Sequence, residues 1–211
     1  MDFTNGQIYH VFNRGNNSQT VFFNRENYLF FFEKIRKCIL PHADILAWCL
    51  MPNHFHLMIS VNQVSVAISE LVTASDSEGF TSSETLTKPS KMRTLNDSIG
   101  IILRSYSRII QKQQKITGSL FQKETKALCL TEPQGISLAY FNSHFGMIGN
   151  LNLPETNYLN VCFNYIHANP VNDRLVSNPE NWEFSSYRDY FCGRKGKLVN
   201  RELAKELGLI E

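Results

Sequence analysis

The sequence has few cysteines, no long apolar run and no excess of charge of one sign. Its five cysteines are spread along the chain without a Cys-x-x-Cys pair, which argues against a disulfide framework or a zinc knuckle. No segment approaches the length of a membrane span, and the first residues carry no basic stretch followed by an apolar run. We therefore expect a reduced, cytoplasmic protein with no membrane anchor. The 21 Lys and Arg nearly balance the 19 Asp and Glu, so any nucleic-acid surface must be a local patch.

Length and composition indicate one domain followed by a tail. A chain of 211 residues is long enough to bury a sizeable core, and no internal repeat divides it. Between residues 73 and 91 the composition shifts to Ser, Thr, Lys and Pro, which cannot bury enough apolar area to offset the entropy of ordering. We expect a single domain over residues 1–190 with a flexible insertion at about 73–91. Residues 191–211 form a C-terminal tail with a short helix.

The first third of the chain has the pattern of a strand, a helix and two further strands. Aromatic and β-branched residues at 7–13 predict a strand that stops at a turn cluster. Apolar residues at helical spacing predict a helix over 26–40, closed by Pro41. Two more strands, over 44–51 and 54–61, are joined by the tight reversal at Pro52-Asn53.

The rest of the chain is predicted to be mainly helical. A long helix spans 95–116, and a turn and a strand follow over 118–130. Residues 133–153 are ambiguous and fit a short helix followed by an irregular loop. A clear helix spans 157–168 and is expected to end at Pro170. The aromatic stretch 182–190 is expected to pack back on the domain, and 201–209 is a short amphipathic helix.

The most informative motif is the pair of histidines around Phe55. Successive side chains of a strand point to opposite faces, so His54 and His56 share one face while Phe55 and Leu57 share the other. Two imidazoles on one face of an apolar strand fit a divalent metal site, since neutral imidazole is a common metal ligand. Hydrogen-bonded or exposed histidines are the alternative, because His-x-His alone is a weak signal.

The second informative stretch pairs a phenol with an amide. On a helix, Tyr165 and Asn169 are four residues apart and project from the same side. A packing tyrosine and a capping asparagine before proline would explain the pair without chemistry. Together with the histidine strand, however, the pair forms the set of groups needed to cut DNA covalently. The ion would polarise a phosphate, and the tyrosine hydroxyl would attack it.

Basic residues mark two candidate DNA contacts. Arg104, Arg108, Lys112 and Lys115 fall on one side of the long helix, which fits either a solvated face or a row of phosphate contacts. Arg14 and Asn16 lie on a glycine turn beside the sheet, where they could contact DNA, although a turn needs no such explanation.

Two further histidines are assigned structural roles. His167 points away from Tyr165 and Asn169 on a helix, so it is expected to be structural. His10 could approach the site from the first strand, but packing or hydrogen bonding is favoured for it.

The order of these motifs resembles the single-tyrosine HUH transposases, and most closely the REP-associated tyrosine transposases. The segments that carry the resemblance are residues 9–11 (Tyr-His-Val), 13–16 (Asn-Arg-Gly-Asn), 50–57 (Leu-Met-Pro-Asn-His-Phe-His-Leu), 118–122 (Gly-Ser-Leu-Phe-Gln), 165–171 (Tyr-Ile-His-Ala-Asn-Pro-Val) and 182–187 (Trp-Glu-Phe-Ser-Ser-Tyr). They span most of the chain in the family's order. Residues 73–91 and 132–155 have no counterpart that we can place.

The resemblance implies an α+β, ferredoxin-like core with an antiparallel sheet, helices on one face and the histidine motif on a central strand. His54 and His56 would be metal ligands, Tyr165 the nucleophile and Asn169 the polar residue that completes the metal site. The family uses Mg²⁺ or Mn²⁺, acts on single-stranded DNA that is often folded into a hairpin, and forms a 5′-phosphotyrosine link. Its members include dimers that exchange the tyrosine helix as well as monomers, so a homodimer stays open here.

Three functions compete at this stage. The first is a transposase or strand-transferase that nicks and rejoins single-stranded DNA through Tyr165. The second is a domesticated DNA-binding protein that keeps hairpin recognition but no longer transposes. The third is a metal-dependent hydrolase that uses water as its nucleophile and would not need Tyr165. The presence of all four expected catalytic residues favours the first.

Overall fold

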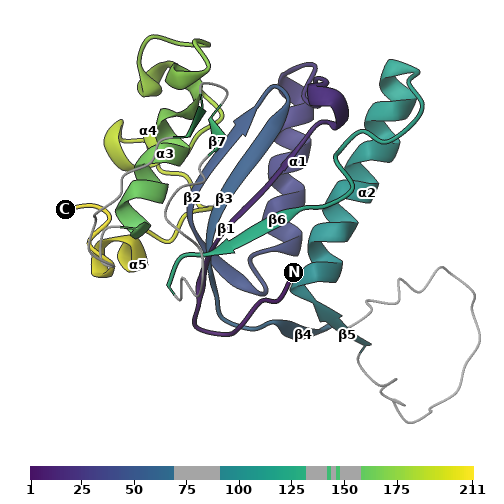
Figure 1. Cartoon of the computed structure of the whole chain (residues 1–211). Coiled ribbons are helices and arrows are strands. Elements are labelled where there is room, and N and C mark those ends of the chain that lie inside the picture. The colour runs from purple at the N-terminus through teal and green to yellow at the C-terminus, as the bar shows by residue number, and fades with distance from the viewer. Residues whose placement is uncertain (69–90, 132–141, 144–145, 148–157) are drawn as a thin grey trace, which may run out of the picture.

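A four-stranded antiparallel sheet forms the middle of the molecule (Figure 1). The computed structural model describes residues 1–68, 91–131, 142–143, 146–147 and 158–211. The strands lie in the order β2-β3-β1-β6, where β1 is Ile8–Arg14, β2 is Ala43–Met51, β3 is His54–Val61 and β6 is Lys126–Cys129. Helix α1 (Arg25–Cys38) joins β1 to β2, and α2 (Leu95–Gln114) precedes β6. This is the order of a ferredoxin-like β-α-β-β-α-β core, and it confirms the predicted fold class.

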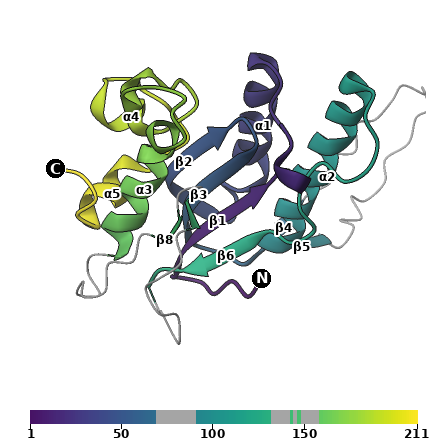
Figure 2. The ribbon, with the colours of Figure 1, turned by 45° about the horizontal axis from the view of Figure 1, so that its top comes forward.

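The two faces of the sheet are covered by different helices (Figures 1 and 2). Helices α1 and α2 cover one face, where the Phe31 ring of α1 lies 5.1 Å from the Phe55 ring of β3. Helix α3 (Tyr158–Asn172) packs on the opposite face against β2 and β3. The pleat of β3 therefore separates its side chains as expected. Phe55 enters the core beneath α1, whereas His56 faces α3.

Helix α3 extends further than its sequence predicts. It includes Pro170 and ends at Asn172, two residues beyond the expected stop. Proline removes only its own backbone donor, and the ladder resumes after it, because the Asp173 N–H donates to the Asn169 carbonyl at 2.9 Å. The Leu175 N–H donates to the Pro170 carbonyl at 2.9 Å, and Arg174 adopts a left-handed conformation with φ 57° that ends the helix. Pro170 is buried, so tertiary packing outweighs its poor helix propensity.

Helix α2 has clear capping signals at both ends. The Thr94 hydroxyl accepts from the Asp97 N–H at 3.1 Å, and the Asp97 carboxylate accepts from the Thr94 N–H at 3.1 Å, which makes a capping box. Lys115, with φ 55°, closes the helix one residue before the predicted end. A short ribbon of β4 (Ser65–Ile68) and β5 (Lys91–Thr94) leads into this helix.

Two sequence predictions fall mostly outside the described residues. The predicted flexible insertion at about 73–91 lies there except for Lys91, which begins β5. Of the ambiguous stretch 133–153, only the two-stranded ribbon of β7 (Asn142–Ser143) and β8 (Gly146–Met147) is described.

The C-terminal segment runs along the outer edge of β2. The Leu50 N–H donates to the Phe184 carbonyl at 2.8 Å, and the Ser186 N–H donates to the Trp48 carbonyl at 2.9 Å, so the aromatic stretch packs back on the domain as predicted. A turn of 3-10 helix (Pro179–Asn181), α4 (Tyr187–Phe191) and α5 (Arg201–Glu206) complete the segment, with Leu198 and Ala204 in the core. None of the described helices is long and apolar enough to cross a membrane.

Candidate catalytic site

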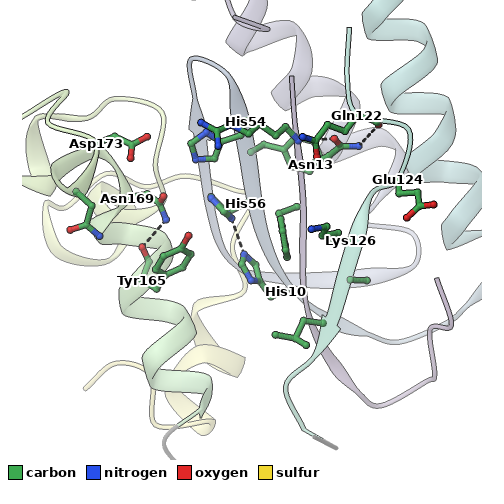
Figure 3. Close-up of a pocket in the computed structure, with 16 residues that line it drawn as sticks. His10, Asn13, His54, His56, Gln122, Glu124, Lys126, Tyr165, Asn169 and Asp173 are labelled. Carbon is green, nitrogen blue, oxygen red and sulfur yellow. Dashed lines mark hydrogen bonds between the residues drawn. The ribbon is translucent and has the colours of Figure 1, made fainter. Parts of the chain in front are cut away.

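A pocket of about 640 Å³ lies between α3 and the sheet face that carries the paired histidines (Figure 3). Strand β3 contributes the two histidines, β1 contributes His10 and Arg14, and α3 contributes the tyrosine and the asparagine. The polar residues that line the pocket include His10, His54, His56, Tyr165, Asn169 and Asp173. The fold thus brings together the four residues that the sequence predicts for catalysis, from elements far apart in the chain.

In both paired histidines, ring atom Nδ1 lies within hydrogen-bond distance of a neighbouring side chain. His54 Nδ1 lies 2.6 Å from Asn53 Oδ1, and because that carbonyl oxygen can only accept, Nδ1 carries the proton and Nε2 the lone pair. His56 Nδ1 lies 2.9 Å from His10 Nε2. His56 Nε2 is buried and has no hydrogen-bond partner among the described residues. The two rings are nearly perpendicular, with centroids 4.9 Å apart.

Burial keeps the imidazoles of His56 and His10 uncharged. It lowers the pKa of His56 well below its ordinary value of 6.5, and repulsion from Arg14 and from the protonated forms of His54 and His10 lowers that pKa further. Burial also lowers the pKa of His10 to about 3. At neutral pH both rings are therefore neutral, the form in which imidazole binds a metal.

Tyr165 faces the histidines from α3. Its ring centroid lies 5.5 Å from that of His56 and 6.0 Å from that of His10 (Figure 3). Burial raises the pKa of the Tyr165 phenol above its ordinary value of 10.0, although a hydrogen bond to the Asn169 side chain acts in the opposite direction. The Asn169 amide also donates to the Tyr165 carbonyl at 3.0 Å. The phenol is thus protonated at neutral pH and must lose its proton before it can act as a nucleophile.

The histidine pair fits a divalent ion. A buried imidazole nitrogen without a partner in the described structure is the kind of group that a metal would satisfy, and Asn53 orients the second imidazole for the same purpose. Across the described residues, no three His, Cys, Asp or Glu side chains group as a metal site. An ion held by His54 and His56 would therefore need an amide oxygen, such as that of Asn169, or oxygens from a substrate.

One further histidine of this region has the role predicted for it, and two other residues have roles that the sequence did not assign to them. His10 was expected to pack or to hydrogen-bond, and it does so within the pocket itself, against His56. Asn53 was read as a turn residue, yet it orients His54. Asp173 follows Asn169 by four residues and lines the same pocket, so its helical spacing from Tyr165 was an available signal. His167 is structural as predicted, buried with Nε2 2.7 Å from Ser186 Oγ.

The predicted DNA contacts separate into three groups: one residue in the catalytic pocket, two in a second pocket and three in neither. Arg14 lines the catalytic pocket, whereas Asn16 lies in the turn that follows and donates its N–H to the Leu120 carbonyl at 2.9 Å. Arg104 and Arg108 line a second pocket, about 690 Å³, between α2 and residues 119–125. Both pockets share Gln122 and Glu124. Lys112 and Lys115 are exposed and do not line either pocket.

The chain resembles a known protein in its structure but not in its sequence. No protein-family profile and no curated protein sequence matches the chain. A solved structure of a REP-associated tyrosine transposase bound to a REP hairpin matches with a TM-score of 0.54 and 12% identity, over 95% of this chain and 92% of that one. The two chains share a fold. This likeness extends over almost the whole length of both molecules and agrees with the strand order described above.

Proposed function

We propose that this protein is a metal-dependent tyrosine transposase that nicks and rejoins single-stranded DNA through Tyr165. The observation that carries the proposal is the position of the Tyr165 ring, 5.5 Å from the ring of His56, in one pocket with His54 and Asn169. A packing tyrosine would not need to face a buried imidazole whose outer nitrogen lacks a hydrogen-bond partner in the described structure. A nucleophile beside a metal site would take this position.

The substrate class is single-stranded DNA folded into a hairpin. The structural relative is a REP-associated tyrosine transposase bound to a REP hairpin, and it shares the fold over nearly its whole length. Arg104 and Arg108 line a groove that meets the catalytic pocket at Gln122 and Glu124, so a strand leaving the pocket has a basic surface to follow. Cleavage at the base of a hairpin would use both surfaces together.

The chemistry follows from the groups in the pocket. The Tyr165 hydroxyl gives its proton to water and its oxygen attacks the scissile phosphorus, and the bond to the 3′ oxygen breaks as the tyrosine bond forms. The released 3′ oxygen takes up a proton, while the 5′ phosphate stays on Tyr165. A 3′ hydroxyl of another strand then reverses the sequence and frees the tyrosine, so the DNA is rejoined without an external energy source. Mg²⁺ or Mn²⁺ held by His54, His56 and Asn169 would supply Lewis-acid polarisation of the phosphate.

The experiment is incubation with a single-stranded hairpin DNA and Mn²⁺, followed by a denaturing gel. We expect a protein–DNA adduct from the native chain and none from Tyr165→Phe, which removes only the attacking oxygen. Tyr158→Phe is the matched control, because Tyr158 lies on the same helix, does not line the pocket, and has a buried hydroxyl without a partner in the described residues. It should form adduct at the native rate.

Two outcomes would favour the competing functions. Nicking by Tyr165→Phe at the native rate would identify a hydrolase that uses water. Tight hairpin binding by the native chain, without adduct or nicking in Mn²⁺, would identify a DNA-binding protein that has lost transposition.

A further inference from the structure

Arg14 places a positive charge in the catalytic pocket. It is the last residue of β1, and in the antiparallel register it lies opposite His54 on β3. The pleat of β1 puts Arg14 on the same face as Phe12 and His10, both of which also line the pocket. The guanidinium Nε is buried without a hydrogen-bond partner among the described residues, which also offer it no ion pair.

The backbone around Arg14 is fixed from several sides. The Arg14 N–H donates to Asn13 Oδ1 at 2.6 Å, and the Arg14 carbonyl accepts from the Gln122 N–H at 2.8 Å. Figure 3 shows Asn13 bonded to Gln122 at the end of the pocket where His54 lies. The next residue is necessarily glycine, since a Cβ on Gly15 would lie 2.1 Å from the Gln19 carbonyl oxygen. The strand end that carries Arg14 is therefore rigid.

A fixed cation with a partly desolvated head and no counter-charge is costly unless a ligand supplies the anion. Glu124 and Asp173 line the same pocket, but neither forms an ion pair with Arg14 among the described residues. The strand register places Arg14 beside His54, so an anion bound there would sit at the reacting centre rather than on a flanking stretch of DNA.

We infer that Arg14 is a catalytic residue that binds the non-bridging oxygens of the scissile phosphate. This inference rests on the proposed function of the pocket. As the Tyr165 oxygen adds to phosphorus, negative charge builds on these oxygens, and the guanidinium N–H groups donate to them. Arginine keeps its proton throughout, so the proton balance of the cleavage step is unchanged. Its planar fork suits two phosphate oxygens better than the point charge of lysine.

The test compares two substrates that differ only at the scissile phosphate. One carries the natural phosphodiester, and the other an uncharged methylphosphonate that lacks one of the charged oxygens. Single-turnover adduct formation is measured in Mn²⁺ at saturating hairpin for the native chain, Arg14→Ala and Arg14→Lys. Hairpin affinity is measured separately with the same variants. Arg36→Ala is the control, because Arg36 is exposed on α1 and its ion pair is with Glu33.

On the phosphodiester, Arg14→Ala should slow adduct formation about 100-fold, and Arg14→Lys should recover part of that loss. On the methylphosphonate, Arg14→Ala and the native chain should react within about threefold of each other, because the charge that Arg14 stabilises is gone. Hairpin affinity should change little, and Arg36→Ala should match the native chain on both substrates. A misfolded variant would instead be slow on both.

Two results would overturn the assignment while leaving the proposed function in place. One is an Arg14→Ala variant that binds the hairpin with native affinity, and so is folded, but slows both substrates equally. The other is an Arg14→Ala variant that reacts at the native rate on the phosphodiester. If the native chain forms no adduct with either substrate, the proposed function itself fails, and the assignment of Arg14 fails with it.

Discussion

Two neighbours decide how the paired histidines face the pocket. Asn53 Oδ1 accepts a hydrogen bond from His54 Nδ1, and His10 lies 2.9 Å from Nδ1 of His56, whose buried Nε2 has no hydrogen-bond partner among the described residues. Partners of this kind fix the tautomer and the orientation of metal-binding histidines. In the proposed metal site, two imidazoles and one amide would leave coordination positions open for phosphate oxygens.

Replacement of either histidine should separate cleavage from binding. His54→Ala and His56→Ala should each abolish adduct formation, while hairpin affinity stays within a few-fold of native because DNA contacts elsewhere carry it. Mn²⁺ affinity of the native chain, measured by calorimetry, should be weak and should rise when a hairpin is present. Tight stoichiometric zinc in the purified protein, or full nicking in excess chelator, would contradict this view of the site.

The Tyr165 phenol predicts a rising pH profile. Its pKa is raised above 10.0 by burial, so the deprotonated fraction grows with pH throughout the neutral range. The pKa of His56 is lowered, so that imidazole stays neutral over the same range and does not limit the rate. Single-turnover adduct formation should therefore increase up to about tenfold per pH unit between about pH 7 and pH 9. A rate that is flat or falls over this interval would show that phenol deprotonation does not limit attack.

The local periodicity of the sequence was enough to assign four site residues to shared faces of a strand or a helix. It was not enough to predict which residues of other elements contact them. The two-residue period of β3 put His54 and His56 together, and the helical period put Tyr165 beside Asn169. The contact between His10 and His56 depends on the register of β1 against β3, in which Phe12 lies opposite His56. That register is set by distant pairing, and no local signal in the sequence reports it.

At the scale of elements, α2 presents its basic side chains in two different settings. All four side chains are exposed, but Arg104 and Arg108 line the groove that meets the catalytic pocket, whereas Lys112 and Lys115 do not. Helical spacing alone could not distinguish these settings, because the groove depends on residues 119–125 packing beside the helix. Phosphate binding by the four side chains stays a prediction.

Alanine substitutions along this stripe should have graded effects. Arg104→Ala and Arg108→Ala should each weaken hairpin binding for all sequences and reduce the salt dependence by roughly one phosphate contact. Lys112→Ala and Lys115→Ala serve as matched changes on the same helix and should have smaller effects. Fluorescence titrations at several salt concentrations measure both quantities. Unchanged affinity and salt slope in all four variants would indicate that the stripe is only a solvated face.

Helix α3 shows where an elementary sequence rule gave a wrong boundary. The expected end at Pro170 rests on the loss of one backbone donor, but the bond from the Asp173 N–H to the Asn169 carbonyl carries the ladder past it. The extension matters for the site, because it brings Asp173 to the pocket one turn beyond Asn169.

At the scale of the whole molecule, an ion pair inside the C-terminal segment fixes its conformation, while backbone hydrogen bonds hold the segment to β2. Arg194 Nε lies 2.5 Å from the carboxylate of Asp189, whose side chain is 2% exposed, and the guanidinium also donates to the Glu183 carbonyl at 2.8 Å. The Tyr190 hydroxyl donates to the Leu46 carbonyl at 2.5 Å, so the same segment is fixed to β2. The same segment contacts the helix that carries Tyr165, because His167 Nε2 on α3 lies 2.7 Å from Ser186 Oγ.

Loss of that ion pair should destabilise the fold. Arg194→Ala leaves the Asp189 carboxylate buried without its partner and should lower the free energy of unfolding by about 3 kcal/mol. Arg25→Ala is a matched control, since it breaks an ion pair with Glu183 whose partners are 59% and 43% exposed, and should have little effect. Urea denaturation of both variants measures the difference. Equal free energies of unfolding for Arg194→Ala and Arg25→Ala would mean that the ion pair of Arg194 with Asp189 does not stabilise the fold.

The overall architecture could be predicted from the sequence more completely than the geometry of the site. Alternating and helical periods gave the order strand, helix, strand, strand, and the motif order indicated a ferredoxin-like sheet, which the strand order β2-β3-β1-β6 confirms. The packing of α3 on the face opposite α1 and α2 is a property of the assembled molecule. It creates the pocket, and it follows from the apolar sides of α3 and β2 meeting rather than from any single motif.

The most direct test of the central claim is mass analysis of the covalent adduct. After reaction of the native chain with a single-stranded hairpin in Mn²⁺, the product is digested with protease and nuclease, and the modified peptide is sequenced. The account predicts a peptide in which Tyr165 carries a nucleotide through its 5′ phosphate, together with a DNA product that ends in a 3′ hydroxyl. Cleaved DNA with a free 5′ phosphate and an unmodified Tyr165 peptide would contradict it.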